Sequence, residues 1–128
     1  MSDLNSTHNR AVWFDIPVAN LDRALAFYSG VLNVKVGTAD AGGTRFGVLE
    51  HDQGNGGCLI EAREKITSSG GILVYMNVDG RIRAAVGSVE ALGGKVLEPT
   101  HSIGPHGFRA VVLDSEGNRI ALHSAVDA

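Results

Sequence analysis

VWFDIPVANLDRALAFYSGVLNVKV, residues 12–36, has the pattern of a strand, a helix and a second strand. The pattern returns after a shift of 60 positions, in ILVYMNVDGRIRAAVGSVEALGGKV, residues 72–96. The identical pairs at this shift are Val18/Val78, Arg23/Arg83, Ala24/Ala84, Leu32/Leu92, Lys35/Lys95 and Val36/Val96. The chain is therefore interpreted as one half-domain used twice.

The first half is predicted to be a strand, a helix and three more strands. Asn20 is a favourable N-cap for the helix, and Gly30 can end it. The later strands are expected at residues 33–37, 44–50 and 57–62. Alternation in residues 11–18 places Val12, Phe14, Ile16 and Val18 on the face toward the helix and Trp13, Asp15 and Pro17 on the other face.

The second half repeats this plan after a polar linker at residues 64–71. A strand is expected at residues 72–78, and a strand near residues 95–98 precedes a loop over residues 99–107. A hairpin of residues 108–114 with residues 118–124 ends the half, because DSEGN is ordinary turn chemistry. The helix between the first two strands is expected to start after Asp79 and to bury Ile82, Ala85, Val86, Val89 and Leu92.

Length and composition limit the class of protein. A chain of 128 residues suits one compact domain, and such a domain buries roughly two-thirds of its unfolded surface. The only cysteine, Cys58, cannot form an internal disulfide and is expected to be a buried thiol. No apolar run reaches the roughly 20 residues of a membrane span, and MSDLNSTHNR lacks the features of a signal peptide. We therefore expect a cytoplasmic protein with no membrane partner.

The charge pattern argues against nucleic acid as a partner. There are 11 basic and 14 acidic residues, a net charge of -3, and the basic residues form no cluster. Attraction to a phosphate backbone needs such a cluster.

The chain resembles the vicinal oxygen chelate family in three features. These are the duplicated plan, the motif IPVANLDRALAFYSGVLNV near the start and the motif FRAVVLDSEGNRIALHS at the end. This family includes glyoxalase I, bleomycin resistance proteins and extradiol dioxygenases, and the motifs are most similar to uncharacterised bacterial members related to lactoylglutathione lyase. The resemblance implies an α+β fold in which two tandem βαβββ modules form a curved mixed sheet around a cavity. Residues 1–10 are expected to be a disordered tail and residues 11–125 one domain, with halves at 11–64 and 71–125.

The resemblance also implies where a metal would bind in metal-dependent members. Counting from the motifs, the four ligand positions fall on Trp13, Glu61, Leu73 and Ala121. Only Glu61 has a side chain that binds metals. We therefore predict no metal and no other cofactor. His101 and His106 lack a third partner nearby in sequence, so they do not predict a zinc site either.

Candidate ligand-binding residues lie on the cavity-facing positions of the strands. Trp13 and Asp15 offer a stacking ring and a carboxylate, or else Trp13 packs between the halves and Asp15 bonds a backbone amide or an arginine. Glu61 is either a general base or a structural acceptor for an arginine such as Arg63. His8, in the tail, and His51, in a hairpin loop, are expected to be solvated.

The second half offers a matching set of candidates. Tyr75 and Asn77 are expected to line the cavity, with Tyr75 as a core residue the alternative. Arg109 follows a glycine-containing loop and can meet an anionic group. His123 can approach the position of Ala121, or it lies at the mouth of the cavity or in a dimer contact.

Three classes of function remain open from the sequence, and the third is a structural or regulatory dimer. The first is a metal-free binding protein that holds a small organic molecule, drug sequestration being one version. The second is a lyase, isomerase or dioxygenase, either metal-dependent or with Glu61 or Asp15 as base. The resemblance and the limited closure of a four-stranded half favour a homodimer.

Overall fold

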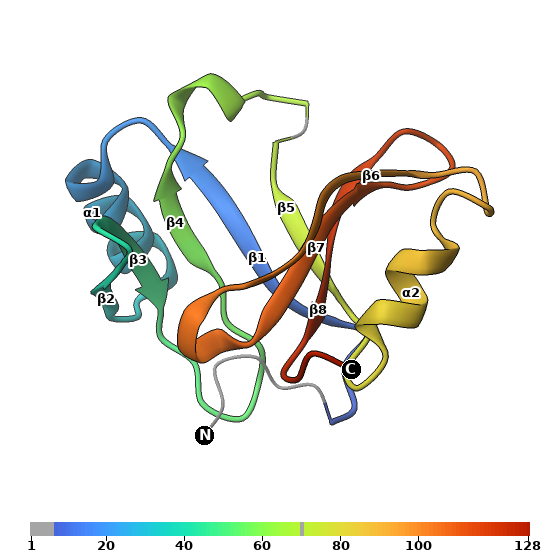
Figure 1. The fold of residues 1–128 in the computed structure, drawn as a ribbon. Helices are drawn as coiled ribbons and strands as arrows, with labels where there is room; N and C mark the ends of the chain where they lie inside the picture. Colours follow the sequence, from blue (N-terminus) through green and yellow to red (C-terminus); the bar gives the residue numbers. More distant parts are fainter. Residues whose placement is uncertain (1–6, 70) are drawn as a thin grey trace. The chain divides into compact units, whose positions relative to one another are not determined.

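The computed structural model describes residues 7–69 and 71–128 (Figure 1). The chain divides into two compact units. The first unit holds residues 13–72, and the second holds residues 73–128 together with the described residues up to Val12.

The first unit is a βαβββ module whose helix is followed by three short strands. Its sheet has the order β2-β3-β4-β1, in which β1 and β4 are parallel and the other neighbours are antiparallel. A short 3-10 helix, η1, follows the last strand. The elements are β1 (Ala11–Val18), α1 (Leu21–Leu32), β2 (Val36–Ala41), β3 (Thr44–Leu49), β4 (Cys58–Glu61) and η1 (Arg63–Lys65).

The second unit has the same topology. Its sheet has the order β5-β8-β7-β6, with β5 and β8 parallel and the remaining pairs antiparallel. The predicted α+β fold of two βαβββ modules is therefore confirmed. The elements are β5 (Leu73–Asn77), α2 (Ile82–Ser88), β6 (Lys95–Ser102), η2 (Gly104–His106), β7 (Phe108–Leu113) and β8 (Arg119–Ser124).

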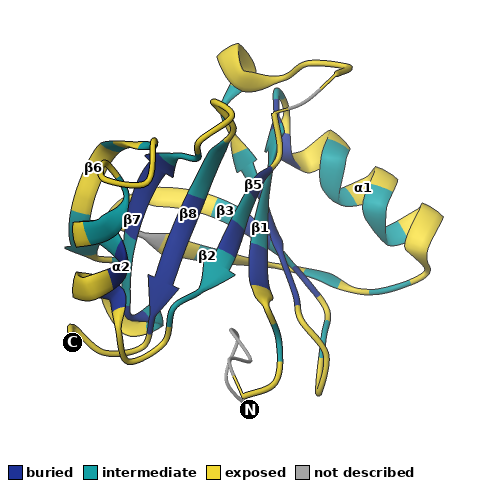
Figure 2. Ribbon diagram, turned by 90° about the vertical axis from the view of Figure 1, so that its right-hand side faces the viewer, coloured by how far each residue is buried: buried dark blue, intermediate teal, exposed yellow. Residues whose placement is uncertain are grey.

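Each unit packs its helix on one face of its sheet. Leu21 of α1 is 2% exposed and packs with Val18 and Leu59, while Ala24, Leu25 and Tyr28 flank this cluster as the helical spacing predicts. In the second unit, Ala85 of α2 packs with Val112 and Leu122. Figure 2 shows buried residues concentrated in β7 and β8, whereas the outer face of α1 is exposed. The opposite sheet face in each unit is therefore the one without a helix.

The helix ends differ from the predictions. Helix α1 continues through Gly30 to Leu32, because Asn33 takes the left-handed conformation (φ 54°) that ends it. Asn tolerates this conformation through its short polar side chain. Helix α2 is short and ends at Ser88, so Leu92, predicted to be buried, lies in the turns that follow and is 75% exposed.

Strand β6 is longer than predicted. It continues to Ser102, through the first part of the expected loop, because it pairs with β7 as far as Ser102 opposite Phe108. Register shifts near Glu98 interrupt this pairing, which hides the strand from simple alternation. His101 is consequently a strand residue, opposite Arg109.

The start of the chain is described from Thr7 onward, so residues 1–6 of the expected tail lie outside the described residues. The carbonyl oxygen of Arg10 accepts a hydrogen bond of 2.7 Å from the backbone N–H of Asn77. None of the helices in residues 7–69 and 71–128 is long and apolar enough to cross a membrane.

Candidate ligand-binding faces

Four predicted site residues lie on the sheet face of the second unit that faces away from α2. Met76, Val112 and Leu122 pack beneath α2. Since strand residues alternate between the two faces of a sheet, the face opposite α2 carries the remaining side chains. These are Tyr75 and Asn77 of β5, Arg109 of β7 and His123 of β8.

Arg109 is held in place by two hydrogen-bond acceptors on this face. Its Nη1 donates a hydrogen bond of 2.6 Å to the hydroxyl oxygen of Tyr75, and its Nε donates one of 3.1 Å to Nε2 of His101. The carboxylate of Glu98 lies 4.0 Å from Nη2, beyond hydrogen-bond distance. We call these four residues, Tyr75, Glu98, His101 and Arg109, the Arg109 cluster. Its guanidinium group is fixed in orientation and partly accessible, since the Arg109 side chain is 25% exposed.

The tautomer of His101 follows from its hydrogen bonds. Nδ1 lies 2.8 Å from the carbonyl oxygen of Pro99, which can only accept. Nδ1 therefore carries the proton, and Nε2 is left as the acceptor that Arg109 needs.

A small residue allows Tyr75 and Arg109 to meet. Strand β8 lies between β5 and β7, and Ala121 is the β8 residue opposite Tyr75. Ala121 is fully buried and has no side chain beyond Cβ. The side chain of Arg109 can therefore reach across β8 to the tyrosine.

His123 contributes a buried nitrogen next to the cluster. It is 2% exposed, pairs across the strands with Arg109 and Asn77, and its Nε2 lies 2.7 Å from the carbonyl oxygen of His106. Nε2 is thus the donor, and Nδ1 has no hydrogen-bond partner among the described residues. Burial lowers the pKa of His123, because removal from water disfavours the charged ring.

Asn77 is engaged in structural hydrogen bonds. Its Nδ2 donates to the carbonyl oxygen of Asn9 at 2.8 Å, and its Oδ1 accepts from the backbone N–H of Asp79 at 2.9 Å. Its amide therefore fixes both the segment before β1 and the turn that leads to α2.

In the first unit, Trp13 and Asp15 lie on the face of β1 opposite α1. Trp13 is 9% exposed and contacts the ring of His51 edge-on, with centroids 5.9 Å apart. Asp15 accepts a hydrogen bond of 3.1 Å from the thiol of Cys58, its neighbour on β4. The expected solvation of His51 is wrong, since the ring is half-buried against Trp13. Cys58 is buried, as predicted.

The strand register changes the position expected for Glu61. Glu61 pairs with Val18, which packs beneath α1, and its side chain is exposed. In the first unit Asp15 is paired with Cys58, and in the second unit Tyr75 is paired with Ala121. Cys58 is therefore the residue of the first unit that is equivalent to Ala121. The prediction that Glu61 is equivalent to Ala121 is wrong. It assumed equal spacing in the two halves, but the second half has three more residues between Tyr75 and Ala121 than the first has between Asp15 and Cys58.

The residues at these positions do not fit the family's metal. Trp13, Leu73 and Ala121 carry no metal-binding atom, and Cys58 adds only one thiol. Within the described parts of the chain, no three His, Cys, Asp or Glu side chains gather as a metal site would require.

Sequence reasoning names Arg109 but misses its partners Glu98 and His101. Both fall outside the predicted site because the pattern of apolar residues predicts that β6 ends near Glu98. The signal that the sequence does contain is the pair His101 and Arg109, which flank the η2 turn and face each other across β6 and β7.

Solved structures show the same fold at low sequence identity. A hypothetical protein from Bacillus halodurans C-125 aligns with a TM-score of 0.68 and 18% identity, covering 92% of this chain and 95% of that one. Methylmalonyl-CoA epimerase from Streptomyces coelicolor aligns with a TM-score of 0.67 and 17% identity, covering 91% and 94%. An NAD-dependent benzaldehyde dehydrogenase from Legionella pneumophila gives 0.59 and 16%, covering 88% and 96%.

No curated protein matches the sequence. A family model does match, over residues 10–122, and it describes the Glyoxalase/Bleomycin resistance protein/Dioxygenase superfamily. The match spans both βαβββ modules and confirms the resemblance seen in the sequence. The chain therefore belongs to the Glyoxalase/Bleomycin resistance protein/Dioxygenase superfamily.

Proposed function

We propose that this protein binds a small organic molecule through an anionic group at Arg109, without the metal site of its superfamily. The observation that carries the proposal is the Arg109 cluster. A guanidinium group is held by Tyr75 and His101, at 2.6 and 3.1 Å, on the sheet face opposite α2.

The chemistry of the cluster suits a carboxylate or a similar anion. The short hydrogen bonds from Arg109 to Tyr75 and His101 hold the planar guanidinium group in one orientation, and such a group can bind a carboxylate through two hydrogen bonds. Fixing its orientation in advance reduces the entropy lost when a ligand binds. The epimerase from Streptomyces coelicolor was solved with 2-nitronate-propionyl-CoA, which supports a fold able to hold an organic ligand.

On the first unit, considered by itself, Trp13 and Asp15 are proposed as ligand contacts. Trp13 offers an aromatic ring and Asp15 a carboxylate oxygen already bonded to Cys58. The resemblance supports a cytoplasmic homodimer as the proposed form of the protein.

A second candidate is a lyase or isomerase of the same superfamily with Asp15 as base. The likeness to methylmalonyl-CoA epimerase favours it, because that protein shares the fold across 91% of this chain. Asp15 is the better of the two predicted bases, since it lies on the face away from α1 and Glu61 pairs with Val18.

The test combines metal analysis with ligand screening on the purified protein. Metal content is quantified, and the melting temperature is followed with nickel, zinc, manganese and iron, then with a panel of small acyclic carboxylates and matched neutral amides. We expect no stoichiometric metal and a rise in melting temperature with carboxylates only, because ligand binding to the native state stabilises it.

Matched variants locate the effect. Arg109→Gln should abolish the response to carboxylates, whereas Arg81→Gln, which removes an exposed arginine before α2, should keep it. A large metal-dependent rise in melting temperature contradicts the metal-free part of the proposal. An unchanged carboxylate response in Arg109→Gln contradicts the role of Arg109, and turnover of a carboxylate that is lost in Asp15→Asn favours the enzyme.

A further inference from the structure

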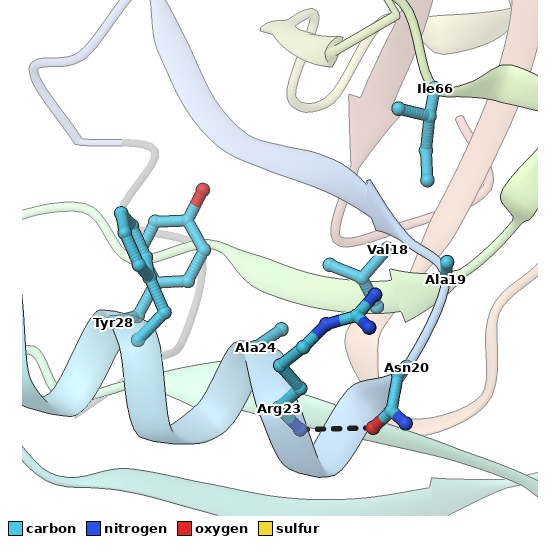
Figure 3. A pocket seen from close by; sticks show the side chains of 8 residues that line it. Val18, Ala19, Asn20, Arg23, Ala24, Tyr28 and Ile66 are labelled. Carbon is cyan, nitrogen blue, oxygen red and sulfur yellow. Dashed lines mark hydrogen bonds between the residues drawn. The ribbon is translucent and has the colours of Figure 1, made fainter.

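A pocket lies on the helix-bearing side of the first unit, away from the faces described above. Its volume is about 300 Å³, and it is bounded by the end of β1, the first two turns of α1 and the segment after η1. Figure 3 shows Ile66 apart from α1, with Val18 of β1 and Ala24 of α1 among the other lining residues. The volume is at the lower end of the roughly 300–1,000 Å³ range of small-molecule sites.

The pocket wall is apolar and unusually exposed. Phe27 is 58% exposed and Ile66 is 48% exposed, although both are large hydrophobic residues. Phe27 contacts Tyr28 edge-on, with ring centroids 5.1 Å apart and an interplanar angle of 80°. A flat apolar group entering the pocket would therefore meet two aromatic rings that line it.

One cation borders this wall. The side chain of Arg23 extends over the pocket in Figure 3, while its backbone N–H is bonded to Oδ1 of Asn20. Within residues 7–69 and 71–128, the guanidinium group of Arg23 has no hydrogen bond and no ion pair. The neighbouring carboxylate, Asp22, is paired with Arg45 at 3.2 Å. The charge of Arg23 is therefore not neutralised by the described residues.

We propose that this pocket, called here the α1 pocket, binds a small aromatic or alicyclic carboxylate. The ring lies against Phe27, Tyr28 and Ile66, and the carboxylate pairs with Arg23. An apolar ring buries surface that is now exposed to water, and the anion meets the charged side chain that lines the pocket. A neutral molecule lacks the second contact, and a cation is repelled by Arg23.

Phenylacetate, benzyl alcohol and benzylamine are the probes, titrated by protein-observed NMR of the full chain. We expect phenylacetate to shift the amides of α1 and of residues 63–67, with benzyl alcohol about fivefold weaker, the upper range for one exposed ion pair. Benzylamine should not bind. Equal binding of phenylacetate and benzyl alcohol, or shifts confined to the second unit, overturns the proposal.

Variants separate the two contacts. Arg23→Gln should reduce phenylacetate affinity to that of benzyl alcohol, and Phe27→Ala should weaken both ligands. The controls are Arg81→Gln and Leu92→Ala, which remove an exposed arginine and a 75% exposed leucine in the second unit and should change neither. Unchanged phenylacetate binding in Arg23→Gln refutes the ion pair.

Two further measurements separate a ligand site in the α1 pocket from binding at Arg109 and from a dimer contact. Arg109→Gln should leave phenylacetate binding at the α1 pocket intact, so the failure of either site is visible separately. If Phe27→Ala instead converts a dimer to a monomer in sedimentation and phenylacetate does not bind the wild type, a second copy of the chain covers the pocket and the proposal is wrong.

Discussion

The hydroxyl of Tyr75 accepts a hydrogen bond of 2.6 Å from Nη1 of Arg109 although strand β8 separates their strands. On β8, Ala121 is opposite Tyr75 and His123 is opposite Arg109, and the side chain of Ala121 ends at Cβ. In the superfamily resemblance this is a position where a metal ligand is expected. Here a small residue at that place makes room for an arginine and a tyrosine to meet.

Enlarging Ala121 should therefore separate Tyr75 from Arg109. Ala121→Val adds two methyl groups at a fully buried site, and overpacking of this kind costs about 1–3 kcal/mol. Ala110→Val is the control, because Ala110 is equally buried and lies on the face of β7 toward α2. Both variants should lose stability in urea, but only Ala121→Val should lose the carboxylate-dependent rise in melting temperature. Equal responses would show that Ala121 does not set the Arg109 geometry.

Removing the hydroxyl of Tyr75 should cost stability as well as orientation. Tyr75 is 4% exposed and its hydroxyl accepts from a charged donor, and such hydrogen bonds contribute about 1.5–3 kcal/mol. We expect Tyr75→Phe to lower the free energy of unfolding by an amount in this range, measured by chemical denaturation. Tyr28→Phe is the matched control, since no hydrogen bond of the Tyr28 hydroxyl is found in the described structure. A negligible effect of Tyr75→Phe would refute the hydrogen bond.

His123 should make the fold sensitive to mild acid. Its pKa is lowered by burial from the ordinary value of 6.5, so the unfolded chain binds this proton more readily than the folded one. Stability should be fully retained above pH 6.5 and fall as the pH drops from 6.5 toward the lowered pKa. His123→Gln should flatten the pH dependence of urea unfolding below pH 6.5. The exposed His8, changed to Gln, should leave the curve unaltered.

The contact between Trp13 and His51 should depend on Gly56. A Cβ on Gly56 would clash with the ring of His51, whereas a Cβ on Gly54, in the same loop, would have nothing within 4 Å. Gly56→Ala should push His51 away from Trp13 and shift the emission of the only tryptophan. Gly54→Ala should not. Identical spectra for the two variants would mean that Gly56 does not position the histidine.

Much of the fold was predictable because it depends on local patterns. Alternation in β1 separates Trp13 and Asp15 from Ile16 and Val18, and the capping of α1 by Asn20 was visible as a residue type. The errors came where long-range pairing overrode such patterns. Strand β6 continues to Ser102 because β7 offers it partners, and the loop-like residues Pro99 and His101 could not reveal this.

The sequence by itself determined the two βαβββ modules and the sheet face on which Tyr75 and His123 lie, because side-chain direction in a strand depends only on residue parity. Only the tertiary structure decided which of these side chains meet. The contact of Tyr75 with Arg109 requires β8 between β5 and β7 in a particular register, with Ala121 opposite Tyr75 and His123 opposite Arg109. The structure likewise decided that Cys58, and not Glu61, is equivalent to Ala121. The segment from Asp15 to Cys58 is three residues shorter than the segment from Tyr75 to Ala121. Register is set by pairing between distant segments, which no local pattern records.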